Sequence, residues 1–187
     1  MAVLKQVEKW KAKKWYNIFA PKLFGETVIS EIPGSDDKGM IGRMIKVNMS
    51  WITHKPEHSF ITVGMKINSI NGEAAHTDLK YLEQTYSYIH SLVRRRQSAI
   101  YTVDSLKDKT GKAFVLKLLI MTVNKVATPK KTAIRRVIAD FLKEYTAAHD
   151  IDEIVNGLIS NALQREAASK IFNIAEINKL ELKKIEL

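Results

Sequence analysis

The sequence predicts an α+β protein in which antiparallel strands form a β-barrel with flanking α-helices. Two patterns lead to this fold class. Apolar residues alternate in short segments at 27–68 and 99–123, and they recur at helical spacing at 79–93 and after residue 128. In addition, 45% of the 187 residues are hydrophobic, which favours a folded chain over a disordered one. We expect a single domain over residues 26–187, preceded by a basic and aromatic arm over residues 1–25.

The first strands are predicted from alternation and from the turns that separate them. Pro33 to Asp37 form the first turn, THKPEHS at 53–59 forms a loop, and Asn71-Gly72 closes the third strand with a turn pair. The strands that these turns delimit cover residues 27–32, 40–49 and 60–68.

A β-hairpin is expected later in the chain, with strands over 99–106 and 112–123 joined by the polar turn KDKTG. Its second strand is apolar on both faces, which places it centrally in the sheet. The tail KLELKKIEL alternates like a strand, although Ile174, Ile177 and Leu180 also fit a helix.

Three helices are predicted from spacing and capping. The first starts at Thr77, and its arginine-rich end at 94–96 suits the negative end of the helix dipole. The second opens at Thr128-Pro129, with the threonine as cap. The third begins at a capping box formed by Asp150 and Glu153 and reaches Leu163. The apolar stripe of the first helix comprises Leu79, Leu82, Tyr86, Ile89 and Val93.

Charge and composition narrow the possible partners. The formal net charge is +10, which indicates nucleic acid, an anionic membrane or an acidic protein. The absence of cysteine excludes disulfides, thiolate zinc sites and cysteine catalysis. Lysines interrupt the start of the chain, so it lacks the apolar run of a signal peptide. The apolar run at 114–123 is too short to span a bilayer, so we expect a soluble, intracellular protein without a membrane partner.

No constellation of residues predicts catalysis. HKPEH at 54–58 has the letters of an inverted zinc-protease motif, but Pro56 and the loop context argue against a helix that would present both histidines. A phosphate-binding glycine loop, an EF-hand loop and a nucleophile elbow are all missing from the sequence. We therefore expect no enzyme, no metal, no cofactor and no small-molecule substrate.

Three basic segments remain. KWKAKKWYNIFAPKLFGE at 9–26 mixes lysines with aromatic rings, which can contact RNA phosphates and bases while Trp15, Phe19 and Phe24 partly anchor the segment. The second segment is the arginine run at 94–96. The third lies at the start of the second helix, where a bound polyanion would offset the repulsion between lysines and the positive helix end. Each segment alone also fits a solvated charged face, but the three together favour nucleic acid.

Several motifs resemble one family of ribosomal proteins. KKWYNIFAPKLFGE at 13–26 resembles the K-x-W-Y-x-x-x-A-P-x-x-F signature of the S-three-Ae family, also called e-type S-one, which archaea and eukaryotes share. The resemblance continues through Ile41-Gly42-Arg43, SLVRRR at 91–96, a V-D-x-x-x-D-x-x-G hairpin at 103–111, AIRR at 133–136 and KIF at 170–172. It covers essentially the whole chain, with a length typical of archaeal members.

The resemblance implies a structural protein of the small ribosomal subunit in the cytoplasm, a ribonucleoprotein component that supports translation. It implies binding to small-subunit rRNA on the platform, near the rRNA 3′ end and the mRNA exit site, beside other platform ribosomal proteins. The alternative is a free RNA-binding factor for translation or RNA processing, built on an oligonucleotide-binding barrel. An enzyme acting on nucleic acid is a weaker candidate, because the carboxylates are scattered along the sequence. A protein-only scaffold is also weaker, because it gives the positive charge no role.

The candidate RNA-binding residues come from the three basic segments and the second strand. We expect the N-terminal arm to be unordered without RNA, because its lysines repel one another and few apolar residues hold it. The candidates are Lys9, Lys11, Lys13, Lys14, Trp15, Tyr16, Lys22, Arg43, Arg94, Arg95, Arg96, Lys130, Lys131, Arg135 and Arg136.

Overall fold

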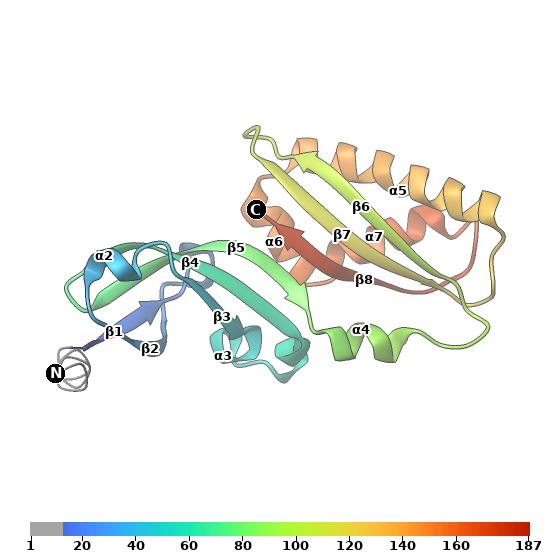
Figure 1. The fold of residues 1–187 in the computed structure, drawn as a ribbon. Coiled ribbons are helices and arrows are strands. Elements are labelled where there is room, and N and C mark those ends of the chain that lie inside the picture. Colours follow the sequence, from blue (N-terminus) through green and yellow to red (C-terminus); the bar gives the residue numbers. More distant parts are fainter. Residues whose placement is uncertain (1–12) are drawn as a thin grey trace, which may run out of the picture. The chain divides into compact units, whose positions relative to one another are not determined.

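A computed structural model describes residues 13–187, which form two compact units, one ending at Tyr81 and the other covering residues 82–187. Figure 1 shows the helices and strands of both units, and strand β5 (Ala74–Gln84) contributes residues to each. The α+β class is confirmed. The strands described in each unit form an open order rather than a closed ring, so the predicted antiparallel barrel is not confirmed. The single domain over residues 26–187 stays a prediction.

The first unit is built on a mixed sheet with the order β2-β1-β5-β4-β3. The β1–β2 and β3–β4 pairs are antiparallel, whereas β1 and β5 run parallel. Its other strands are β1 (Lys14–Phe19), β2 (Val28–Gly34), β3 (Met44–Asn48) and β4 (Ile61–Asn71). Short helical turns connect them: η1 (Lys22–Phe24), α2 (Asp37–Met40), α3 (Met49–Thr53) and η2 (Pro56–Phe60).

Strand β1 lies inside the segment that the sequence assigns to an arm. Tyr16 and Ile18 are buried, while Lys14 and Trp15 are exposed. This alternation lets β1 pair with β2 on one side and with β5 on the other. An unordered arm is expected from the sequence because few apolar residues would hold it. In residues 14–19, however, the buried side chains of Tyr16 and Ile18 hold the strand to the first unit.

Residues 77–84 are a strand, so the helix predicted from Thr77 is wrong. Thr77 is buried in β5, where its hydroxyl donates to the Phe19 carbonyl at 2.7 Å. Pairing with β1 and β4 outweighs the helical spacing of the apolar residues, since strand formation depends on tertiary partners. Only α4 (Tyr86–Leu92) is helical, so the arginines at 94–96 follow the helix rather than end it.

Other boundaries also differ from the predictions. The second strand starts at Met44, after Arg43, and the predicted loop at 53–59 is mostly occupied by the ends of α3 and η2. Ala127, not Thr128, is the N-cap of α5 (Thr128–Ala148). The predicted third helix is two helices, because Asn161 adopts a left-handed φ of 59° between α6 (Ile151–Ile159) and α7 (Ala162–Ile171). The capping box of Asp150 and Glu153 is confirmed.

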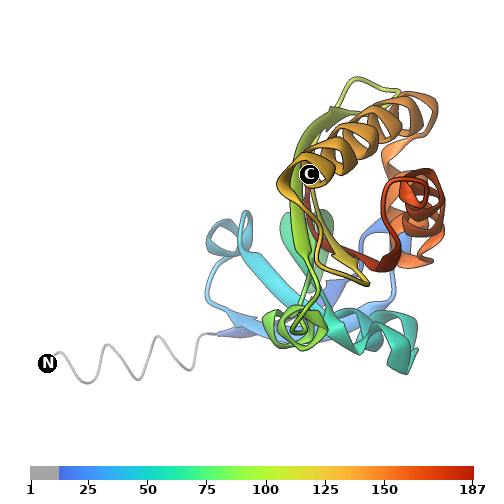
Figure 2. The same ribbon diagram turned by 90° about the vertical axis from the view of Figure 1, so that its right-hand side faces the viewer.

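The second unit places three helices on one face of an antiparallel sheet, as Figure 2 shows. Its strand order is β5-β8-β7-β6, with β6 (Ala99–Lys107), β7 (Ala113–Thr122) and β8 (Ile177–Glu186). Helix α5 contacts β6, and α7 contacts both α5 and β8. The predicted hairpin is confirmed, and the tail forms a strand rather than a helix.

Strand β7 is buried on both faces, as its sequence predicts. Leu116, Leu118 and Ile120 are fully buried and alternate with Leu119 and Met121. Leu119 and Met121 pack with Ile89 of α4, so their neighbours of opposite parity face α5 and α7. Strand β7 thus forms the centre of the second unit.

The β6–β7 turn is closed by Asp108. Its carboxylate accepts hydrogen bonds from the Thr110 hydroxyl at 2.7 and 2.8 Å and from the Lys112 amide at 2.7 Å. These hydrogen bonds lower the pKa of Asp108, and the bond from Thr110 has the largest effect. Gly111 has a φ of 84° in the same turn, a conformation that glycine adopts without a steric cost. The aspartate and glycine of this hairpin motif are therefore explained by the turn.

The lowered pKa predicts how stability depends on pH. Because the folded-state pKa of Asp108 lies below the unfolded value of about 3.9, its contribution is present above that pH and is lost as pH falls through the folded pKa. We expect Asp108→Asn to lower the melting temperature at pH 7, and the gap to wild type to shrink below about pH 4. Thermal melts between pH 2 and 7 measure this, with the exposed Asp140→Asn as control. A gap that stays constant with pH would contradict the role of the ionised carboxylate.

Gly34 allows close packing between α2 and β1. A Cβ at this position would lie 2.7 Å from the Met40 sulfur and 2.8 Å from the Tyr16 ring, and both side chains are buried. Gly34→Ala should therefore lower the free energy of unfolding by about 1–3 kcal/mol through overpacking. Gly39→Ala, where no atom lies within 4 Å of the added carbon, is the matched control. Urea unfolding measures both, and equal midpoints would show that the site is not tightly packed.

Candidate nucleic-acid interface

Ser98 joins two basic segments that are distant in the sequence. Its amide donates to the Thr122 hydroxyl at 3.1 Å, and its carbonyl accepts from the Thr122 amide at 3.1 Å. Its hydroxyl accepts from the Val126 amide at 3.0 Å. Ser98 and Thr122 are both buried, so these bonds form in an environment where leaving them unmade is costly. The α4–β6 and β7–α5 connections therefore meet at one end of the second unit.

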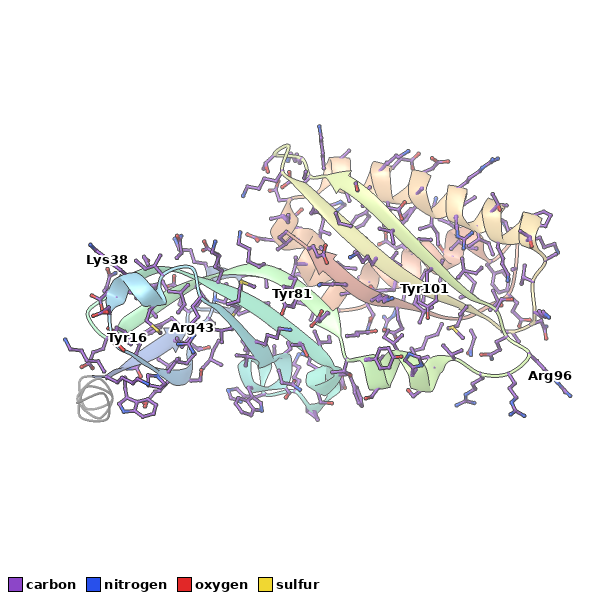
Figure 3. All side chains as sticks on the ribbon, viewed as in Figure 1. Tyr16, Lys38, Arg43, Tyr81, Arg96 and Tyr101 are labelled. Atoms are coloured by element: carbon purple, nitrogen blue, oxygen red, sulfur yellow. The ribbon has the colours of Figure 1, made fainter. Side chains whose placement is uncertain are left out.

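The arginines at 94–96 lie on the first of these connections. All three are exposed, and no hydrogen bond or ion pair to the rest of the described chain holds their side chains. Arg96 has a left-handed φ of 66°, which turns the backbone just before Ser98, and Figure 3 shows its side chain pointing away from the sheet. The three guanidinium groups are therefore available to an anionic partner.

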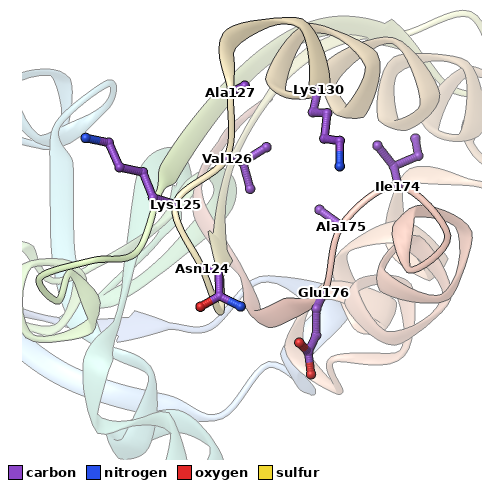
Figure 4. A pocket seen from close by; sticks show the side chains of 8 residues that line it. All are labelled: Asn124, Lys125, Val126, Ala127, Lys130, Ile174, Ala175 and Glu176. Carbon is purple, nitrogen blue, oxygen red and sulfur yellow. The ribbon is translucent and has the colours of Figure 1, made fainter.

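The start of α5 carries the second basic segment. Lys130 is exposed and Lys131 is half-buried, both in the first turn after Pro129. Lys130 points into a pocket between the β7–α5 and α7–β8 connections, whereas Lys125 points away from it (Figure 4). Glu176 also lines this pocket, so its charge is mixed. Residues 122–127 are tied to Ser98, which fixes where α5 begins.

We call Arg94, Arg95, Arg96, Lys125, Lys130 and Lys131 the basic end of the second unit. Five of these six residues were predicted from sequence, and Lys125 was missed because it stands alone in the connection before α5. The remaining predicted pair on α5 lies further along the helix. Arg135 and Arg136 are exposed, and the Arg135 Nε donates to the Tyr101 carbonyl at 3.3 Å, so Arg135 also ties α5 to the edge strand β6.

In the first unit, the structure brings Lys13 and Arg43 to one pocket. This pocket is also lined by Gly34, Asp36 and Met40, and Figure 3 shows Arg43 near α2. The Arg43 guanidinium contacts the Met40 sulfur at 3.5 Å. Lys38 of α2 is exposed close by and was not predicted. Asp36 offsets part of the positive charge here, so this surface is less basic than the basic end.

Trp15 and Tyr16 have opposite positions on β1. Trp15 is 61% exposed, whereas Tyr16 is 1% exposed and its hydroxyl donates to the Asp37 carboxylate at 2.6 Å. That hydrogen bond raises the pKa of Tyr16. Lys14 and Lys22 are exposed, while Lys9 and Lys11 lie outside the described residues. Tyr16 therefore anchors the strand. The expectation that Trp15 is a partial anchor is wrong, because its ring is exposed and a partner can reach it.

The structure offers no ligand set for a metal in the part of the chain that it describes. In the HKPEH segment, His54 ends α3 with a left-handed φ of 54°, and the His58 Nδ1 lies 2.9 Å from the Thr53 hydroxyl. The two histidines are thus on separate helical turns rather than on one helix face. No helix among residues 13–187 is long and apolar enough to cross a membrane.

The contrast between Trp15 and Tyr16 predicts separate effects of their substitution. Trp15→Ala should leave the urea midpoint unchanged, because its ring is exposed, but it should weaken RNA binding if the ring stacks on a base. Tyr16→Phe should lower the midpoint and leave RNA affinity unchanged, because it removes the hydrogen bond to Asp37. Urea titrations and RNA binding by fluorescence anisotropy distinguish these effects. The assignment fails if Tyr16→Phe alters RNA affinity more than Trp15→Ala does.

The sequence is similar to those of known proteins along most of its length. A model of the Ribosomal S3Ae family matches residues 2–187. The small ribosomal subunit protein eS1 of Sulfolobus acidocaldarius is 33% identical over 181 residues, which cover 96% of this chain and 92% of that protein. The protein of the same name from Methanoculleus marisnigri is 28% identical over 183 residues, covering 98% and 93% of the two chains. This chain therefore belongs to the Ribosomal S3Ae family.

Proposed function

We propose that this chain is a structural constituent of the small ribosomal subunit that binds small-subunit rRNA and does not act as an enzyme. Its family membership and the names of its relatives support the ribosomal role. The observation that carries RNA binding is the junction at Ser98, which brings the arginine run and the lysines at the start of α5 together. Phosphates commonly bind such clusters of arginine and lysine.

The energetics of the basic end favour a polyanionic partner. Lys130 and Lys131 lie at the positive end of the α5 dipole, which is unfavourable for cations, and the arginines at 94–96 add like charge nearby. Bound phosphates would offset this repulsion, and their counterions would be released on binding. We therefore assign the basic end to the rRNA backbone, where it fixes the position of the protein rather than reading sequence.

The finer location follows from the resemblance of the motifs at 13–26 and 91–96. We place the protein on the cytoplasmic ribosome, at the platform of the small subunit, near the rRNA 3′ end and the mRNA exit site, with neighbouring platform proteins as partners. The basic residues of segment 1–25 contact rRNA in this proposal, while Tyr16 and Ile18 hold β1 in the first unit. A free RNA-binding factor is the competing function and differs in binding ribosomes reversibly.

The first experiment follows the protein through sucrose gradients of a native lysate at low and then at high salt, with mass spectrometry of each fraction. A structural constituent stays with the small subunit at one copy per subunit through the high-salt wash. A protein that leaves the subunit or sediments alone would contradict the proposal and support the free factor. Mapping the cleavage of rRNA around the retained protein then tests the platform location.

The role of the basic end is tested by salt dependence. Replacing Arg94, Arg95 and Arg96 with alanine should weaken binding to small-subunit rRNA and reduce the slope of log affinity against log salt by about one for each phosphate that the variant no longer binds. The matched control replaces Lys107, Lys109 and Lys112 with alanine, which removes the same charge from the β6–β7 hairpin. Equal slopes for both triple variants would contradict a specific role for the arginines.

A further inference from the structure

Helix α4 presents an aromatic pair to solvent. Tyr86 is 76% exposed, although its spacing in the sequence predicts a buried position. Its ring centroid lies 3.9 Å from that of His90, one helical turn later, with an angle of 44° between the rings. An exposed tyrosine held against a second ring offers a flat apolar surface whose orientation is already restricted.

The opposite side of α4 explains why these rings point outward. Ile89 is buried against Leu119 and Met121 of β7, and Leu92 packs against the same cluster. Glu181 also holds Tyr88. Its carboxylate accepts one hydrogen bond from the Tyr88 hydroxyl at 3.1 Å and another from the Gln84 side-chain amide at 2.7 Å. The side of α4 that contacts the sheet therefore carries Tyr88, Ile89 and Leu92. Tyr86 and His90 lie on the remaining side of the helix.

The segment that carries the ring pair is positively charged. Residues 84–103 contain no aspartate or glutamate, and the arginines at 94–96 follow His90 by four to six residues. The arginine side chains are exposed and make no hydrogen bond or ion pair with the described residues around them. The segment thus combines a stacking surface with cations that can bind successive phosphates.

We propose that Tyr86 and His90 form a stacking site for an unpaired RNA base, while the arginines at 94–96 bind the adjoining phosphates. This inference rests on the proposed function and specifies the RNA: a base inside a duplex cannot reach an aromatic ring, so the nucleotide is unpaired. Charge complementarity favours RNA over a protein partner, because the segment itself has exposed cations and rings without an acidic residue, and the Glu181 carboxylate that contacts α4 is buried. Arg94 to Arg96 position the strand, and the ring pair holds its base.

The test compares two probes with the full-length protein by fluorescence anisotropy. One probe is fluorescein-labelled decauridine, and the other is a labelled decamer with the same phosphates but abasic sugars. Tyr86→Ala should weaken binding of decauridine by roughly fivefold or more, since base–aromatic stacking has that magnitude, and should change binding of the abasic decamer by less than twofold. Tyr86→Phe should retain wild-type affinity, because its ring still stacks.

Phe172→Ala is the matched control, because Phe172 is similarly exposed, at 66%, but lies outside this segment. The proposal is overturned if Tyr86→Ala binds decauridine as tightly as wild type, which would leave the rings for a protein partner. It is also overturned if both probes lose affinity equally, since the ring would then not contact a base. If stacking fails while the triple arginine variant still shows a reduced salt slope with rRNA, the proposed rRNA binding stands without this inference.

Discussion

The burial of both faces of β7 is the constraint around which the second unit is arranged. Helices α5 and α7 bury one face of the strand, which carries Leu116, Leu118 and Ile120. Helix α4 buries the other face, which carries Leu119 and Met121. Burial of these side chains removes apolar area from water on both faces of one strand. The position of α4 follows from this requirement, and so does the exposure of Tyr86 and His90 on its outer side.

The end of the same strand organises the charged surface. Thr122, the last residue of β7, is buried and bonds to the backbone of Ser98, while the Ser98 hydroxyl holds Val126. The hydrophobic strand and the basic end are therefore parts of one arrangement. A concentration of like charge destabilises a protein on its own, so such a surface is consistent with a chain that functions bound to a polyanion.

The first unit separates anchoring from exposure along a single strand. Alternation on β1 buries Tyr16 and Ile18 and leaves Lys14 and Trp15 outside. The Tyr16 hydroxyl binds Asp37 of α2, and Gly34 leaves room for this packing. Basic and aromatic residues therefore occur together here for two reasons: one ring stabilises the unit, and the neighbouring side chains are exposed, where a partner can reach them.

The sequence by itself determined the features that depend on nearby residues. These include the hairpin at Asp108, the capping box at Asp150, the double-sided apolar pattern of β7, the basic segments and the motifs of the family. Tertiary structure alone decided that residues 74–84 form a strand, that Tyr86 is exposed, and that Ser98 joins two basic segments. These outcomes depend on hydrogen bonds and packing between residues far apart in the chain, as between Thr77 and Phe19, and local spacing carries no information about such partners.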